Sequence, residues 1–181
     1  LGIATYEWIE GERVLSYGVK ELKAALSFLS VLHHNTKAEQ FKFFPMAADA
    51  CPKGSDIEKQ IKRRLLEFDD ASLKYNELEQ FLKNDFKPLL NEIISWSQAS
   101  WPSSSGYKIP IDKNEFILSP SDFGFHNALY SQNDNLIFHD FEYFGWDDPV
   151  KLISDFSHHA AMNLSKEIEQ LWFLEVSEIY G

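Results

Sequence analysis

Residues 118–149 read LSPSDFGFHNALYSQNDNLIFHDFEYFGWDDP. Two short apolar runs in this stretch, Ala128–Tyr130 and Leu136–Phe138, are separated by Ser131–Asn135, whose polar residues are typical of a turn. The pattern predicts a β-hairpin that is entered through a polar loop. A hairpin brings its two ends close together, so polar residues at those ends are expected to be neighbours.

Three polar side chains are expected to meet at this point. Asp122 and Asn127 lie in the loop before the first strand, and Asp140 follows the second strand. Converging carboxylate and amide oxygens are the ligands that Mg²⁺ prefers. A further carboxylate can orient a hydroxyl or accept its proton. Together these groups are the equipment that phosphoryl transfer requires.

The rest of the chain predicts mainly helices. Apolar residues recur at helical spacing in Val19–His33, in Asn76–Trp96 and in a segment that begins at Ser165. A capping-box pattern, Ser55 followed by Glu58, predicts a helix over Asp56–Phe68, and Pro149 is expected to open one that runs to about Ala161. Pro88 is expected to kink or break the helix over Asn76–Trp96. Short apolar runs predict strands at Leu1–Ile9 and Phe116–Leu118. Since strands and helices do not alternate regularly, we expect an α+β, mainly helical fold and not a parallel sheet.

The motifs resemble those of the aminoglycoside phosphotransferase and choline kinase-like family, which has the protein kinase-like fold. The resemblance rests on Leu118–Asn127, Phe138–Glu142, Gly145–Pro149 and Asp155, and it is densest over Phe116–His159. It is looser over residues 1–34 and extends only to helical character over residues 41–112.

The resemblance implies that the chain is the C-terminal lobe of a protein kinase-like fold, with a small catalytic β-hairpin. Residues 1–11 would be the end of an N-lobe strand and the hinge, and residues 12–181 the helical C-lobe. Within that lobe, the resemblance implies a catalytic loop at 119–127 and a metal-binding segment at 138–149. The N-terminal lobe would be absent from this chain, because no Gly-x-Gly pair is available for a phosphate-covering loop.

Individual roles also follow from the resemblance. Asp122 occupies the position of the catalytic aspartate, which engages the acceptor hydroxyl. Asn127 and Asp140 occupy the positions of the Mg²⁺ ligands. The carbonyl of Glu7 and the N–H of Ile9 match hinge groups that contact adenine.

Further residues are weaker candidates. Asp155 matches a buried aspartate that braces the catalytic loop through backbone N–H groups. Glu142 is a candidate substrate-binding or metal-adjacent carboxylate, and Trp146 could contact a cationic group through its ring. Asp147 is compatible with a cationic acceptor. A structural role remains open for Glu142, Trp146 and Asp147.

The implied activity is that of an ATP-dependent small-molecule kinase. Mg²⁺ would be the cofactor, ATP the co-substrate, and a hydroxyl of an aminosugar, sugar or amino alcohol the acceptor. Two departures from the family pattern are Pro120-Ser121, where His-Gly is usual, and Gly124, where a histidine is frequent. The alternative is therefore a non-catalytic kinase-like module that binds nucleotide or another protein. We expect residues 1–181 alone to be inactive and the natural protein to be longer at its N-terminus.

Composition limits the remaining possibilities. The formal net charge of −11 disfavours binding to nucleic acid phosphates. The single cysteine, Cys51, excludes an internal disulfide, and no apolar run is long enough to span a membrane, so a cytoplasmic setting is expected. Adjacent histidines on a helix point about 100° apart, so neither His33–His34 nor His158–His159 is expected to chelate one ion. The oligomeric state and the acceptor are left open.

Overall fold

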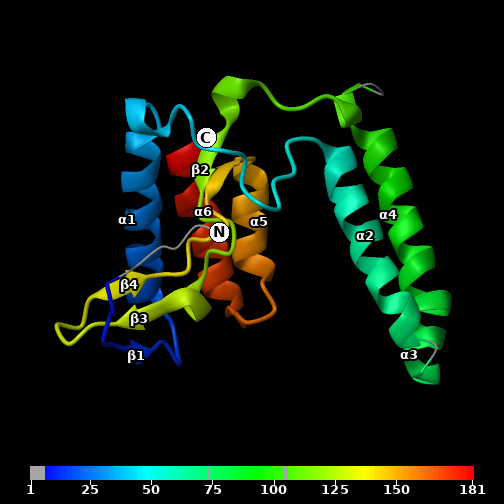
Figure 1. Cartoon of the computed structure of the whole chain (residues 1–181), viewed down its shortest axis with the longest axis horizontal. Helices are drawn as coiled ribbons and strands as arrows, with labels where there is room; N and C mark the ends of the chain where they lie inside the picture. Colours follow the sequence, from blue (N-terminus) through cyan, green and yellow to red (C-terminus); the bar gives the residue numbers. More distant parts are fainter. Residues whose placement is uncertain (1–6, 73, 104–105) are drawn as a thin grey trace, which may run out of the picture. The chain divides into compact units, whose positions relative to one another are not determined.

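A computed structural model describes residues 7–72, 74–103 and 106–181. Helices predominate in it and the sheets are small and antiparallel, so the predicted α+β, mainly helical class is confirmed. The chain divides into two compact units (Figure 1). The first, here called the site unit, comprises Leu1–Ala50 and Phe116–Gly181, and the second, the helical unit, comprises Cys51–Glu115.

Three helices form most of the site unit: α1 (Val19–Asn35), α5 (Pro149–His158) and α6 (Lys166–Tyr180). The helix starts follow the sequence, since Asp148 accepts from the Val150 N–H ahead of α5 and Ser165 accepts from the Ile168 N–H ahead of α6. Helix α6 packs against both α1 and α5. The expected helices at these three places are confirmed.

The core of the site unit is aromatic where α5 meets α6. Trp172 is fully buried, and its ring stacks on that of Phe156 with centroids 3.9 Å apart. The indole Nε1 donates a hydrogen bond of 3.0 Å to the carbonyl of Ile153. Phe125, from the predicted catalytic loop, meets Phe156 edge to face. The loop is therefore anchored directly in the core.

The predicted hairpin is present as β3 (Ala128–Tyr130) and β4 (Leu136–Phe138), paired from Ala128 opposite Phe138 to Tyr130 opposite Leu136. The short strand β1 (Glu12–Arg13) pairs with the outer edge of β3 and gives the order β1-β3-β4. Figure 1 shows the three strands beside α1. The hairpin turn contains Asp134 with a positive φ of 59°.

A second small sheet contains the strand expected at Phe116–Leu118, but its pairing partner was not predicted. Strand β2 (Ile117–Ser119) pairs antiparallel with β5 (Gly145–Asp147). On its other edge, β5 exchanges backbone hydrogen bonds with residues 45–47 through the N–H and carbonyl of Trp146. Gly145 permits this approach, because a Cβ there would lie 2.5 Å from the backbone nitrogen of Ala47. Strand β5 depends on hydrogen-bond partners that are distant in the sequence, so its own three residues do not predict it.

The expected strand at Leu1–Ile9 is wrong in the part that can be compared. Residues 1–6 lie outside the described residues, and residues 7–11 form no strand. The side chain of Trp8 is 85% exposed, so it is not packed into the core as an apolar strand residue would be. The first strand is instead β1, which begins at Glu12.

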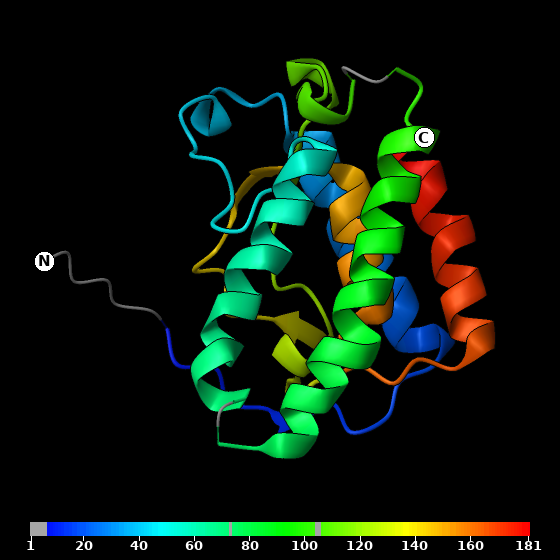
Figure 2. The ribbon, with the colours of Figure 1, turned by 90° about the vertical axis from the view of Figure 1, so that its right-hand side faces the viewer.

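The helical unit contains α2 (Gly54–Ser72), α3 (Asn76–Phe81) and α4 (Lys87–Ser100), with a π-helical turn at Leu82–Phe86. Helices α2 and α4 run side by side in Figures 1 and 2. Pro88 lies in the first turn of α4, directly after the π-helical turn. Proline lacks the N–H that a continuous helix needs, which explains why the helix expected over Asn76–Trp96 is interrupted there.

Short 3₁₀ turns complete the described chain: Glu39–Phe41, Gly106–Lys108, Lys113–Glu115 and Phe125–Asn127. No helix among the described residues is both long enough and apolar enough to cross a membrane.

Candidate functional site

The loop at 119–127 is fixed by side chains that alternate in direction. Phe123 and Phe125 are buried, whereas the residues next to them, Asp122 and His126, stay partly exposed. The N–H of Phe125 also donates to the Sδ of Met162 at 3.0 Å. The two phenylalanines therefore hold the loop in the core, while the side chain of Asp122 stays 40% exposed.

Asp122 and Asn127 are brought together as predicted. The Nδ2 of Asn127 donates to the backbone carbonyl of Asp122 at 2.9 Å and to its Oδ2 at 3.2 Å. Ser121, which precedes Asp122, has a positive φ of 69°, and its N–H donates to the Oγ of Ser119. A non-glycine residue in this conformation is strained, and such strain tends to occur at functional sites.

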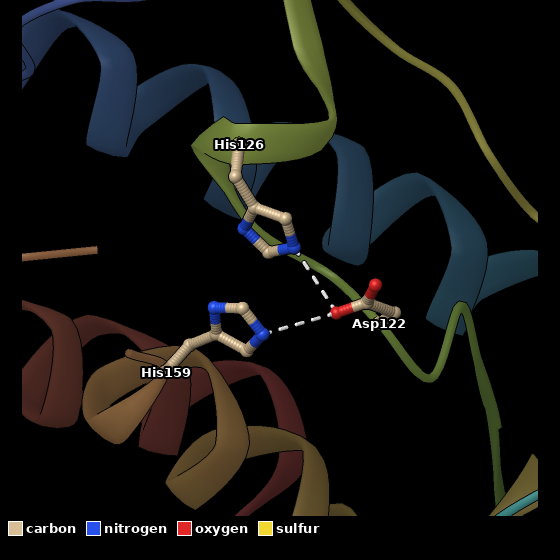
Figure 3. A group of neighbouring side chains, drawn as sticks. All are labelled: Asp122, His126 and His159. Carbon is tan, nitrogen blue, oxygen red and sulfur yellow. Dashed lines mark hydrogen bonds and ion pairs between the residues drawn. The ribbon is translucent and has the colours of Figure 1, made fainter. Parts of the chain in front are cut away.

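Two histidines complete the surroundings of Asp122 (Figure 3). The Nε2 of His126 lies 3.0 Å from Asp122 Oδ1, and the Nε2 of His159, at the end of α5, lies 3.3 Å from the same oxygen. The two imidazole rings are parallel within 1°, with centroids 4.0 Å apart. Asp122, His126 and His159 are called the Asp–His–His cluster below.

Hydrogen-bond partners indicate where the ring protons lie. The N–H of Ala161 donates to His159 Nδ1 at 3.1 Å, so this nitrogen is an acceptor and the ring proton belongs on Nε2. The Nδ1 of His126 is buried and has no hydrogen-bond partner within the described chain. An unpaired acceptor there is less costly than an unpaired N–H, which also favours the proton on Nε2. His126 then donates to Asp122, and the protonated Nε2 of His159 lies 3.3 Å from the same oxygen.

This network leaves one hydrogen-bond acceptor position of the Asp122 carboxylate unused. An ionised carboxylate offers about four acceptor positions, two on each oxygen. His126 uses one position on Oδ1, beside which His159 also lies, and the amide of Asn127 uses one on Oδ2. One position on Oδ2 remains, and Asp122 is 40% exposed, so an external hydroxyl can reach it.

The packing of His126 also accounts for Gly124. A Cβ at position 124 would lie 2.6 Å from His126 Nδ1 and 2.7 Å from Met162 Sδ. The ring of His126 therefore occupies the space that a side chain at 124 would need. The histidine that the family pattern has at this place is thus incompatible with the present position of His126.

Asp140 lies where the hairpin returns to the loop. The N–H of His139 donates to the carbonyl of Asn127 at 3.0 Å, which makes Asp140 the next residue after a direct backbone contact of Asn127. Asp140 is exposed and has a positive φ of 66°. Asn127 and Asp140 are therefore neighbours through the backbone.

The carboxylates near Tyr143 raise the pKa of its hydroxyl. Glu142 accepts a hydrogen bond from the Tyr143 hydroxyl and raises its pKa, and the charges of Asp140 and Asp122 raise it further. Glu142 is itself exposed. Its position beside Asp140 is compatible with the predicted metal-adjacent role and with a solvated one.

Two of the weaker candidates lie in strand β5. Trp146 is half-buried, and its backbone groups are used in pairing with residues 45–47. Asp147 is only 1% exposed and accepts a hydrogen bond of 2.8 Å from the Asp148 N–H. Its burial argues against the predicted contact with a cationic substrate and favours a structural role.

The burial expected for Asp155 is not observed. Its side chain is 44% exposed and forms an ion pair with Lys151 one helical turn earlier. Lys151 also lies 3.8 Å from the carboxylate of Asp147. The buried acidic residue of this region is therefore Asp147. Asp155 is linked to Asp147 through Lys151 on α5, and not to the 119–127 loop.

The two hinge candidates are described but not held by a strand. Glu7 is exposed and Ile9 is partly buried. They precede β1, whose residues Glu12 and Arg13 pair with β3. The segment that contains Glu7 and Ile9 is thus linked through β1 to β3, the strand that begins directly after Asn127.

Within the described residues, the cluster that could hold a metal ion through histidine, cysteine or carboxylate ligands is the Asp–His–His cluster, whose ligand atoms lie within 4.8 Å of one another. The sequence analysis missed His159, because it considered the His158–His159 pair only as a local chelator. The two side chains do diverge as expected, since His158 lies 3.7 Å from Glu169. Only the tertiary fold places His159 opposite His126.

Comparison with known proteins gives no match: no protein family model, no curated protein and no solved structure matches this chain. Function must therefore be argued from the site itself.

Proposed function

We propose that this chain is the C-terminal lobe of a small-molecule kinase that transfers the γ-phosphoryl group of ATP to a hydroxyl. The observation that carries the proposal is the bonding of Asn127 to Asp122 and of the His139 N–H, directly before Asp140, to Asn127, with strained backbone at Ser121 and Asp140. The ordered motif that contains these residues resembles the aminoglycoside phosphotransferase and choline kinase-like family. The mainly helical α+β architecture is compatible with such a lobe.

In this proposal Asp122 receives the acceptor hydroxyl at the remaining position on Oδ2. The imidazoles and the amide of Asn127 hold the carboxylate in one orientation. A carboxylate fixed in this way can orient the hydroxyl and accept its proton as the phosphoryl group arrives. Positioning accounts for much of the catalysis of phosphoryl transfer.

Asn127 and Asp140 would hold Mg²⁺. Because the Nδ2 of Asn127 is engaged with Asp122, its Oδ1 is the atom that remains for a cation. The exposed carboxylate of Asp140 supplies a second oxygen ligand. Mg²⁺ usually binds through one or two protein carboxylates or carbonyls, together with water and phosphate oxygens. When bound, it would neutralise the charge of the ATP phosphates.

The non-catalytic alternative retains one specific argument. The carboxylate of Asp122 already accepts from His126 and Asn127, and His159 lies 3.3 Å from it. Pro120 and Gly124 also depart from the family pattern. Such a module would bind nucleotide, or another protein, without turnover. Nucleotide binding combined with an assay of ATP consumption separates the two functions.

The decisive experiment is a thermal-shift comparison of the full-length natural protein, including any residues that precede Leu1, with ATP, Mg²⁺ or both. At about 100 times the dissociation constant, a ligand stabilises the native state by about 2.7 kcal/mol. We expect stabilisation that requires both components. The same melting temperature under all conditions would contradict both nucleotide-binding readings.

A further inference from the structure

We propose that the Asp–His–His cluster binds a transition-metal ion of the zinc class, at a site distinct from the proposed Mg²⁺ ligands. Two imidazole nitrogens and one carboxylate oxygen are three protein ligands, the number that a zinc site with an open fourth position uses. Imidazole favours zinc, copper, nickel and iron, whereas carboxylate, carbonyl and water favour magnesium. The donor set thus differs in kind from Asn127 and Asp140.

The spacing of the ligand atoms supports this site. Bonds of about 2.0–2.1 Å in tetrahedral geometry place two zinc ligands about 3.3 Å apart. Asp122 Oδ1 lies 3.0 Å from His126 Nε2 and 3.3 Å from His159 Nε2. Two of the three ligand pairs are therefore at coordination spacing, and the third lies within 4.8 Å.

The three side chains are held on two separate supports, and two of them are accessible to solvent. The loop that carries Asp122 and His126 is anchored by buried Phe123 and Phe125, and His159 follows the last residue of α5. The side chain of His159 is 34% exposed and that of Asp122 is 40% exposed. An ion can therefore reach the carboxylate of Asp122 and the imidazole of His159 from solvent.

Metal binding requires a change of tautomer that conserves protons. An ion on Nε2 needs that lone pair, so each ring proton moves to Nδ1 through solvent and the ring stays neutral. His159 then gives up the hydrogen bond from Ala161, and His126 places an N–H where no partner is present within the described chain. These costs weaken binding and select ions that bind imidazole strongly. We expect Zn²⁺ and Cu²⁺ to bind and Mg²⁺ not to bind at this site.

The zinc site itself does not depend on the proposed kinase function. The effect of zinc on phosphoryl transfer does rest on that function. Asp122 is the residue proposed to receive the acceptor hydroxyl. A metal ion on its carboxylate would prevent that contact, so zinc would inhibit phosphoryl transfer while magnesium supports it.

The test is calorimetric titration of the full chain with ZnCl₂, without nucleotide. We expect wild type to bind one equivalent, and His126→Gln and His159→Gln each to bind at least about tenfold more weakly, since each removes one of three ligands. His158→Gln is the matched control, because His158 is adjacent but lies beside Glu169. It should bind as wild type does, and MgCl₂ should not displace the zinc.

Several outcomes would overturn the site. These are absence of zinc binding by wild type, unchanged binding by His159→Gln, and binding lost through His34→Gln, which would place the ion in the groove between α1 and α6 that His33 and His34 line. If a histidine variant fails to fold, nitrogen-15 NMR of wild type replaces it. Zinc must then shift the Nε2 signals of His126 and His159, and unchanged signals refute the proposal. Because no assay uses ATP, failure of the kinase proposal leaves this result intact.

Discussion

At the scale of single residues, Gly124 is required by space and not by backbone conformation. Its φ of 174° is extended, which any residue can adopt. The neighbouring atoms exclude a side chain at position 124, because a Cβ there would lie under 3 Å from both His126 and Met162. One missing methyl group therefore permits the ring of His126 to approach the loop.

We expect Gly124→Ala to destabilise the protein by about 1–3 kcal/mol, the usual cost of overpacking a filled site. Urea unfolding would measure it. Gly18→Ala is the control, since the nearest atom to a Cβ there is 3.8 Å away and an alanine at this helix cap should cost about 1 kcal/mol or less. Equal stability of Gly124→Ala and wild type would show that His126 does not occupy this space.

Asp122 is the residue on which the proposed chemistry depends. We expect Asp122→Ala to lower turnover of the full-length natural protein by about 10²–10⁴-fold, the usual contribution of a positioned acid or base. Circular dichroism should show a retained fold. Asp85→Ala, at an exposed position of the helical unit, should leave turnover unchanged. Near-wild-type turnover in Asp122→Ala would remove the catalytic assignment.

At the scale of elements, α1 is joined to β3 by a buried carboxylate. Glu21, in the first turn of α1, is 8% exposed and accepts hydrogen bonds from the Gly18 N–H and the Tyr130 hydroxyl. Burial alone would raise the pKa of Glu21, but these hydrogen bonds outweigh it and lower the pKa. The hydrogen bond to Glu21 raises the pKa of Tyr130 to about 12.

We expect Tyr130→Phe to destabilise the fold by about 1.5–3 kcal/mol, the contribution of a hydrogen bond to a charged group. The control is Tyr75→Phe, at an exposed tyrosine, with an expected effect within about 0.5 kcal/mol. Urea unfolding at neutral pH measures both. A Tyr130 variant as stable as wild type would show that Glu21 finds another partner.

The pKa shifts of Glu21 and Tyr130 predict opposite dependences of folding stability on pH. The folded pKa of Glu21 lies below its ordinary value of 4.5, so its stabilisation is present above pH 4.5 and is lost as pH falls through the lowered pKa. The folded pKa of Tyr130 is raised, so its contribution is present below pH 10 and is lost as pH rises toward 12. Glu21→Gln should therefore reduce the loss of stability in acid relative to wild type, and Tyr130→Phe the loss in alkali. Parallel curves for variant and wild type would contradict the linkage.

Elements whose residues carry their own pattern could be predicted from the sequence. The helices α1, α2, α5 and α6 have apolar residues at helical spacing, and the hairpin β3–β4 has a turn of suitable composition. Strand β5 could not be predicted, because residues 45–47 and β2 supply its hydrogen bonds. The meeting of Asp122 with Asn127 is local and was predicted. The meeting of Asp122 with His159 depends on how α5 packs, and no short motif encodes it.

At the scale of the whole molecule, the site unit is built from two separate stretches of chain. Residues 45–47 and β2 lie on opposite edges of β5, so about two strand spacings, roughly 10 Å, separate them. The helical unit is inserted between these stretches. The ends of the insertion therefore leave the site unit close to the two segments that flank β5.

We expect the site unit to fold when residues 51–115 are replaced by a flexible Gly/Ser linker of about eight residues, which can span this distance. Cooperative thermal unfolding and dispersed amide NMR signals would verify folding. A linker variant with a scrambled order of the same glycines and serines should behave identically. A molten, non-cooperative product would mean that the helical unit is needed for the core.

The buried indole in the core of the site unit gives the protein a built-in optical signal. Trp172 is shielded from water, while Trp96 and Trp101 in the helical unit are exposed. Emission from a shielded indole moves to longer wavelength when water reaches it, whereas an exposed indole already emits there. A red shift during denaturation therefore reports mainly on the site unit, and circular dichroism reports on helices of both units. Comparing the two curves would reveal whether the units melt together, without attaching any label.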